Sequence, residues 1–158
     1  MTLIAVVDEN WAIGRNGDQL IYIPQDLKRF QTLTRGHAVL FGRKTMETFP
    51  GGRPLKGRRN LILSTRADYQ VESGEVFTTL EGALEAAPAD TFVIGGESVY
   101  RQCLPHCHTA YITKVQAAFP ADTHIPNLDE DPHWSAVEEE GPFVHEGIPF
   151  TYVTYRRV

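Results

Sequence analysis

Five short apolar runs constrain the fold of this chain more than any other feature of its sequence. They are nearly continuous in apolar character, rich in β-branched residues and too short for helices, as expected of strands covered on both faces. Helix-like segments separate them, and this alternation predicts an α/β fold with a largely parallel sheet. The expected strands are residues 3–7, 38–41, 60–63, 91–94 and 110–115, and the expected helices are residues 25–34, 44–48, 80–87 and 97–104.

The end of the chain follows a different pattern. Residues 134–140 and 150–156 are strand candidates with no helix between them, which predicts an antiparallel pair at one edge of the sheet, joined by residues 141–149. The acidic segment 127–132 reads as a solvated loop. With no internal repeat and no convincing linker, the 158 residues are expected to form one domain, residues 1–158.

Charge and composition exclude several classes of function. Fifteen Lys and Arg against twenty Asp and Glu give a net charge of −5, which does not favour nucleic acid or an anionic membrane as a partner. The N-terminal residues lack the basic flank and apolar length of a signal peptide, so we expect a cytoplasmic protein. Cys103 and Cys107 lie beside His106 and His108, but no second ligand pair follows, and we expect reduced cysteines and no metal.

Residues suited to phosphate follow one of the runs, at the strand end where α/β sheets bind ligands. Gly42, Arg43, Lys44 and Thr45 come directly after residues 38–41 and open a helix. Free amides at a helix start and two neighbouring cations attract an anion. Cations at the amino end of a helix oppose its dipole, so a purely structural explanation of Arg43 and Lys44 is weakened.

Two further strand ends extend this pattern. Ser64, Thr65 and Arg66 follow another run, although such residues are common in any exposed turn. Gly95 and Gly96 precede a helix, where bare backbone suits a pyrophosphate, but a tight strand-to-helix turn explains them equally well. Neither the dinucleotide-binding fingerprint nor the Walker loop is present. Three such ends on one sheet edge together predict an extended, multiply phosphorylated ligand such as NADPH.

Asp26 lies in the stretch LIYIPQDL, two positions after Pro24. Proline in a first helical turn followed by an acid stabilises a helix start, and spacing alone favours this structural explanation. However, apolar neighbours such as Leu27 and Phe30 would enclose the carboxylate, and an enclosed carboxylate needs a donor-rich or cationic ligand. Burial would raise its pKa and the helix terminus would lower it, and the sequence leaves the balance open.

Taken together, these motifs resemble those of the bacterial dihydrofolate reductases, along almost the whole chain. The resemblance rests on LIAVVDENWAIGRNG, IPQDLKRF, GRKTMETF, GRPLKGRRNLILST, VIGGESVY and ADTHIP, in this order. It implies an eight-stranded, mostly parallel twisted sheet with an antiparallel C-terminal edge and four flanking helices. It also implies hydride transfer from NADPH to C6 of 7,8-dihydrofolate with protonation at N5, antifolate inhibitors as further ligands, and a monomer.

The resemblance also implies roles for individual residues. Asp26 would be the one acidic group at the pterin, accepting hydrogen bonds from N3 and the 2-amino group, with support from Thr113. Arg58 would hold the carboxylate of the glutamate tail. Ile21 and Tyr100 complete the expected catalytic set. The substrate slot would be lined by Ile4, Val6, Leu27, Phe30, Phe49, Leu55 and Ile94.

The implied cofactor site is larger and divides into three parts. The adenosine phosphates would lie against Gly42, Arg43, Lys44, Thr45, Leu63, Ser64, Thr65 and Arg66, the pyrophosphate against Thr45 and the amides of Gly95, Gly96, Glu97, Ser98 and Val99, and the nicotinamide against Val6, Ile13, Ile94 and Tyr100. The family has a cis peptide bond at the position of Gly95 and Gly96. Trp11 is expected to pack only on the surface, in a mobile loop that Asp122 would tether.

One departure from the family affects the expected rate. Where the family usually carries Pro-Trp, this chain has Leu20 and Ile21, and isoleucine lacks the indole N–H that holds a water near the pterin. We therefore expect slower turnover than in a typical member. Two alternatives stay open: a reductase of another pteridine or pyrimidine on the same fold, and a folate- and NADPH-binding homologue with weak catalysis. Asp26, Phe30 and Arg58 favour folate.

Overall fold

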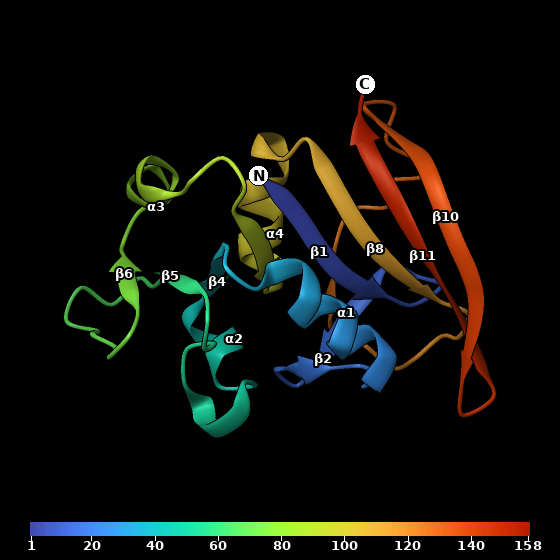
Figure 1. Cartoon of the computed structure of the whole chain (residues 1–158), viewed down its shortest axis with the longest axis horizontal. Coiled ribbons are helices and arrows are strands. Elements are labelled where there is room, and N and C mark those ends of the chain that lie inside the picture. Colours follow the sequence, from blue (N-terminus) through green and yellow to red (C-terminus); the bar gives the residue numbers. More distant parts are fainter.

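An eight-stranded sheet forms the centre of the computed structural model, which describes residues 1–158 (Figure 1). Its strand order is β10-β11-β8-β1-β7-β4-β5-β6; the strands from β8 to β6 run parallel, and β11 is antiparallel to β8 and β10. The predicted fold class is confirmed. The strands are β1 (Thr2–Val7), β4 (Ala38–Gly42), β5 (Arg59–Leu63), β6 (Glu75–Phe77), β7 (Phe92–Gly95), β8 (Thr109–Val115), β10 (Trp134–His145) and β11 (Ile148–Arg157).

Four α-helices flank this sheet, as predicted. Two single 3-10 turns supplement them, and no helix combines the length and apolar character needed to cross a membrane. Thr79 caps one helix by accepting a hydrogen bond from the amide of Gly82 at 3.1 Å, which satisfies a free N–H of the first turn. The helices are α1 (Pro24–Thr34), α2 (Arg43–Met46), α3 (Leu80–Ala86) and α4 (Glu97–Cys103), and the turns are η1 (Pro50–Gly52) and η2 (Leu104–His106).

The apolar runs are continuous because both faces of the sheet are covered. Successive side chains of a strand point to opposite faces, so Leu40 joins a core with residues of α3 and α4, while Val39 and Phe41 join a second core with Met46 of α2 and Phe30 of α1. Leu40, Val39 and Phe41 are all fully buried. A parallel sheet sandwiched in this way leaves its strand ends as the accessible edge.

A small second sheet was not predicted. It has the order β3-β2-β9 and consists of β2 (Ala12–Arg15), β3 (Asp18–Gln19) and β9 (Thr123–His124). The Asn16 amide donates to Asp122 Oδ2 at 2.9 Å, and the Asp122 amide donates to the Gly14 carbonyl at 3.0 Å, so the predicted tether of this loop is confirmed.

Two predictions outside the site were wrong. Trp11 is buried in the main core, with a left-handed φ of 57° and its ring 5.9 Å from that of Tyr155 in an edge-on contact. The second is the end of β10, which continues past the expected residue 140 to His145, with a register shift between Glu140 and Phe143. By contrast, the acidic loop is exposed at Asp129 and Glu130 as predicted, and Asp129 also accepts hydrogen bonds from Lys114 Nζ and the Tyr155 hydroxyl, both at 2.7 Å.

We predict that Leu40→Ala lowers the free energy of unfolding by about 2–5 kcal/mol, because it leaves a cavity in a fully packed core. Urea unfolding followed by tryptophan fluorescence measures this change. Val137→Ala is the control, since Val137 is 52% exposed on β10 and its truncation should change stability by less than about 0.5 kcal/mol. Equal losses in the two variants would contradict this account of the core.

Candidate active site

The carboxyl ends of three adjacent parallel strands open into one large cleft. Strands β7, β4 and β5 are neighbours in the sheet, so the segments that follow them meet at the same edge. The cleft has a volume of about 1360 Å³ and is lined by residues of α1, α2, α4 and the loop before α1. Every residue predicted for the site lines this cleft except Arg66. The structure thus brings together residues that lie more than a hundred positions apart, such as Ile4 and Thr113.

Asp26 is enclosed where α1 crosses β8. The Thr113 hydroxyl, from β8, donates to Asp26 Oδ1 at 2.5 Å, and this is the carboxylate's only side-chain hydrogen bond. Burial raises the pKa of Asp26 above its ordinary value, although the Thr113 hydrogen bond and the charge of Arg29 oppose the shift. Burial is thus the largest influence on the pKa of this carboxyl group. A partly desolvated carboxylate with free acceptor positions is suited to a ligand with paired N–H donors.

Tyr100 closes the floor of the cleft on the opposite side. Its hydroxyl donates to the Ile4 carbonyl at 2.7 Å, which ties α4 to β1. Burial raises the pKa of Tyr100 well above its ordinary value, with a smaller contribution from the negative charge of Asp26, so this phenol stays neutral. Tyr100 is therefore a fixed aromatic wall and a hydrogen-bond donor that is already satisfied.

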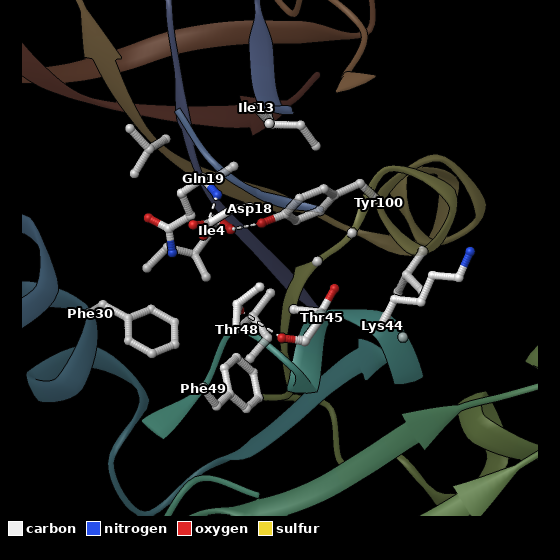
Figure 2. A pocket seen from close by; sticks show the side chains of 18 of the residues that line it. Ile4, Ile13, Asp18, Gln19, Phe30, Lys44, Thr45, Thr48, Phe49 and Tyr100 are labelled. Carbon is white, nitrogen blue, oxygen red and sulfur yellow. Dashed lines mark hydrogen bonds between the residues drawn. The ribbon is translucent and has the colours of Figure 1, made fainter. Parts of the chain in front are cut away.

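Aromatic side chains form the slot beside Asp26. Figure 2 shows Phe30 of α1 and Phe49 near each other at one end of the cleft, with Tyr100 across from them. Phe49 packs edge-on against Phe41 of β4, with ring centroids 5.0 Å apart, so its orientation is fixed by the core. Leu27 is 52% exposed although it lines the cleft, as expected for an apolar side chain that faces an open binding slot.

Arg58 is held at the mouth of this slot by two hydrogen bonds. Its Nε donates to the Lys56 carbonyl at 2.9 Å, and its Nη1 donates to Thr34 Oγ1 at 3.2 Å. Thr34 is itself fixed at the end of α1 by donating to the Phe30 carbonyl at 2.8 Å. The remaining N–H groups of a guanidinium oriented in this way are available to a carboxylate. Arg53 and Lys56, which sequence reasoning missed, line the same region.

Backbone without side chains approaches Thr45 at the other end of the cleft. A Cβ at Gly95 or Gly96 would lie 3.4 or 3.3 Å from the Thr45 side chain, and one at Gly42 would lie 3.3 Å from Val99 Cγ2. Gly95 has a φ of 140°, which favours glycine, and the Gly95–Gly96 peptide bond is cis, as the resemblance predicted. The cradle is thus narrow, and side chains larger than hydrogen would fill it.

Cations flank this cradle. Arg43 and Lys44 line the cleft, and Figure 2 shows Lys44 and Thr45 projecting from the start of α2. Arg66 lies outside the lining, but its guanidinium carbon is 6.0 Å from the centre of the Tyr69 ring, and that of Arg43 is 5.8 Å from the same ring. The two arginines therefore share one neighbourhood, with Arg66 at its outer side. The acids nearby are at the limit of ion-pair distance, with Glu47 4.0 Å from Arg43 and Asp68 3.9 Å from Arg66, while Glu97 accepts a hydrogen bond from the His124 amide at 2.7 Å.

The loop before α1 carries polar residues that sequence reasoning did not assign. Asp18, Gln19 and Tyr22 line the cleft, and the Tyr22 hydroxyl donates to Asp18 Oδ1. Burial and this hydrogen bond raise the pKa of Tyr22 to about 12. Ile21 also lines the cleft and packs against the apolar cluster of Ile23 and its neighbours. The only feature of the sequence that could have pointed to these residues is the departure of this stretch from the family pattern.

The cysteine and histidine segment has no part in the cleft. Cys103 and Cys107 are free thiols buried in the main core, and burial raises the pKa of Cys103 to about 12 and that of Cys107 to about 11. Such thiols are unreactive packing residues. No three His, Cys, Asp or Glu side chains come together as a metal site.

This combination of a sheltered carboxylate, an aromatic slot and a basic glycine cradle matches one family. The dihydrofolate reductase family model matches residues 1–157. The chain belongs to the dihydrofolate reductase family. It is 35% identical over 167 residues to the dihydrofolate reductase of Mycobacterium tuberculosis, covering 99% of each chain, and 33% identical over 154 residues to that of Bacillus subtilis, covering 96% of this chain and 90% of the relative.

A solved structure agrees over the whole fold. The dihydrofolate reductase from Enterococcus faecalis, complexed with NADP(H) and RAB-propyl, superposes with a TM-score of 0.87 at 32% identity, covering 99% of this chain and 95% of the other. The resemblance inferred from the motifs is confirmed, together with the expected class of enzyme, an NADPH-dependent oxidoreductase.

We predict that Asp26→Asn stabilises the protein at neutral pH. Because folding raises the pKa of Asp26, the protonated carboxyl contributes stability below its unfolded pKa of about 4, and this contribution is lost as the pH rises through the folded pKa. Asparagine does not ionise. The free energy of unfolding of the variant relative to the parent, measured in urea between pH 4 and pH 8, should therefore increase with pH. A difference that stays flat or falls would contradict the burial of a charge at this position.

Proposed function

We propose that this protein reduces 7,8-dihydrofolate to 5,6,7,8-tetrahydrofolate, with hydride transfer from NADPH to C6 and protonation at N5. The observation that carries the proposal is the enclosed Asp26 carboxylate, hydrogen-bonded to Thr113 and facing an aromatic slot. Its free oxygen positions suit the paired N–H donors of an aminopyrimidine ring. A negative charge held there also favours the protonated pterin over the neutral one.

The remaining residues of the slot orient the substrate in this proposal. Phe30 and Phe49 contact the faces of the pterin and benzoyl rings, in an apolar wall that also includes Ile4, Val6, Leu27, Leu55 and Ile94. Arg58 pairs with the α-carboxylate of the glutamate tail at the mouth, where its orientation by Thr34 reduces the entropy lost on binding. The substrate would thus be fixed at three places: the edge of the pterin, the faces of its rings and the carboxylate of its glutamate tail.

The other half of the cleft fits a phosphorylated dinucleotide. When bound, NADPH supplies the hydride. Thr45 and the amides at the start of α4 would hold the pyrophosphate, because the glycine backbone leaves room for close approach. Arg43, Lys44 and Thr65, with Arg66 at the outer side, would bind the 2′-phosphate and so distinguish NADPH from NADH. The further cofactor contacts are assigned to Ile13, Gly42, Leu63, Ser64, Ile94 and Tyr100.

A homologue that binds both ligands but turns over slowly is a second candidate, favoured by the loop before α1. Ile21 occupies the position of the family tryptophan and offers no hydrogen-bond donor. The same assay distinguishes the two candidates, because a pure binding protein would not consume NADPH.

The place of action and the assembly remain predictions. Two free, buried cysteines fit the reducing cytoplasm that we propose as the compartment. We also propose that the protein acts as a monomer and binds antifolate inhibitors in the folate half of the cleft. Light scattering of the purified protein measures whether it is a monomer. Competition by antifolate inhibitors against dihydrofolate measures whether they bind in the folate half of the cleft.

We predict that Asp26→Asn lowers kcat/KM by roughly 10- to 150-fold, since a charge-assisted hydrogen bond is worth about 1.5–3 kcal/mol. The loss of NADPH absorbance on adding dihydrofolate measures turnover. Lys28→Gln, which removes a charge two positions away on α1 and outside the cleft, is the control and should keep parental activity. No NADPH consumption by the parent would contradict the proposed function itself.

We predict that Ile21→Trp accelerates the chemical step by roughly 2- to 10-fold, because an added indole N–H can hold a water at the pterin, and a hydrogen bond contributes about 0.5–1.5 kcal/mol. Single-turnover rates with NADPH and its deuterated form isolate hydride transfer. Ile21→Phe is the matched control, since it adds a ring without a donor and should give no gain. Equal acceleration by both variants would attribute the effect to packing.

A further inference from the structure

Arg29 is held in an unusual position between α1 and the sheet. Its guanidinium carbon lies 4.1 Å from the centre of the Tyr152 ring and 5.6 Å from that of Tyr111, the distances of cation–π contacts. Arg29 lines both the main cleft and a small depression of about 360 Å³ beside α1. The two rings therefore keep this cation against the protein, where a charge acts more strongly on its neighbours than in bulk water.

The rings that hold Arg29 belong to the same strands as the Asp26 site. Tyr152 of β11 is the cross-strand partner of Thr113 of β8, and paired residues point to the same face of a sheet. Thr113 in turn donates to Asp26, which lies three positions before Arg29 on α1. Residues three apart are neighbours on a helix surface. Carboxylate and guanidinium are thus adjacent, one above Thr113 and the other above Tyr152.

No ion pair joins the two groups. The salt bridges of the structure do not include Arg29 with Asp26, and Thr113 remains the carboxylate's only side-chain donor. A direct pair would occupy the acceptor positions that a ligand needs. A cation clamped close by, yet not bonded, acts on the charge of the carboxylate and leaves its oxygens free.

We propose that Arg29, clamped over the rings of Tyr152 and Tyr111, is a positioning residue that keeps the enclosed Asp26 carboxylate ionised for substrate binding. The inference rests on the proposed function for its consequence in catalysis, but the electrostatic effect itself does not. The charge of Arg29 lowers the pKa of Asp26, opposing the larger effect of burial. Without this cation, less of the carboxylate would be charged at a given pH.

Other charged or titratable groups face this region, and none replaces Arg29. Tyr100 of α4 and Tyr152 have pKa values raised by burial and stay neutral. Lys28 of α1 and Glu140 of β10 line the small depression but not the cleft, and neither contributes to the shift at Asp26. Tyr111 completes the set as the second ring under the guanidinium.

The consequence for the reaction has a definite sign. Removing the positive charge raises the pKa of Asp26, so ionisation requires a higher pH. If the ionised carboxylate binds the pterin, the KM for dihydrofolate should increase most at acid pH and approach the parental value at alkaline pH. A merely structural role of Arg29 would change KM by a similar factor at every pH.

The test is a titration of the Asp26 carboxyl by NMR in protein labelled with 13C at the aspartate carboxyl carbons, with Asp26→Asn used to assign the resonance. We expect Arg29→Gln to move the midpoint to higher pH and Arg29→Lys, which keeps the charge, to return it toward the parent. Arg29→Met keeps the apolar stem without the charge and is the second variant if Arg29→Gln does not fold. Lys28→Gln is the matched control and should leave the midpoint unchanged.

An unchanged midpoint in both charge-removing variants would overturn the inference, and so would an equal rise in Lys28→Gln or a failure of Arg29→Lys to restore the parental value. The KM for dihydrofolate is then measured against pH in the same variants, and a profile that does not follow the midpoint would refute the action through Asp26. The titration needs no turnover. If the protein does not reduce dihydrofolate, the NADPH assay shows this, while the midpoints still report on Arg29.

Discussion

The hydrogen bond between Thr113 and Asp26 is the contact on which the rest of the site depends. It joins α1 to β8 across 87 positions of the sequence and fixes where the helix crosses the sheet. Phe30 and Leu27 on the same helix line the slot, and Phe30 is also held by packing against the core cluster of Val39, Phe41 and Met46. The bond also compensates part of the cost of burying the carboxylate, which would otherwise be paired with nothing but apolar surface. A function that requires a charge in an apolar cleft is thereby compatible with a stable fold.

The parallel sheet provides the second half of the site in a different way. Strands β7, β4 and β5 are adjacent, so the segments that follow them converge through the backbone pairing of the strands. The backbone of Gly95 and Gly96 passes close to Thr45 there, so that an added Cβ would lie 3.4 or 3.3 Å from the Thr45 side chain. One end of the cleft thus depends on a partly buried side-chain hydrogen bond and the other on the order in which the strands pair. We expect the former to be sensitive to point substitutions and the latter to tolerate them unless they add a side chain at the glycines.

The sequence was sufficient to predict the strands and helices whose residues follow a regular pattern of burial. Residues 38–41 and 61–63 are apolar throughout because both sheet faces are covered, and such continuous apolar runs indicate buried strands. The strands β2, β3 and β9 were missed because they have four, two and two residues, and Asp18 and Gln19 of β3 are exposed. Trp11 was misplaced for a related reason. Its burial depends on a left-handed backbone that no local propensity predicts for tryptophan.

The residues of the site also fall into those that the sequence predicts and those that only the fold reveals. Residues that match family motifs line the cleft as predicted, because motif order fixes their positions on the sheet. Arg29 lies within the motif IPQDLKRF, but the resemblance assigns it no role. Its significance depends on Tyr152, which is more than a hundred positions away and becomes a neighbour only through the register of β11 with β8. Long-range electrostatic neighbours of this kind cannot be inferred from spacing. The ionisation of a catalytic carboxylate is therefore a property of the folded sheet, even where the carboxylate itself is evident from eight residues of sequence.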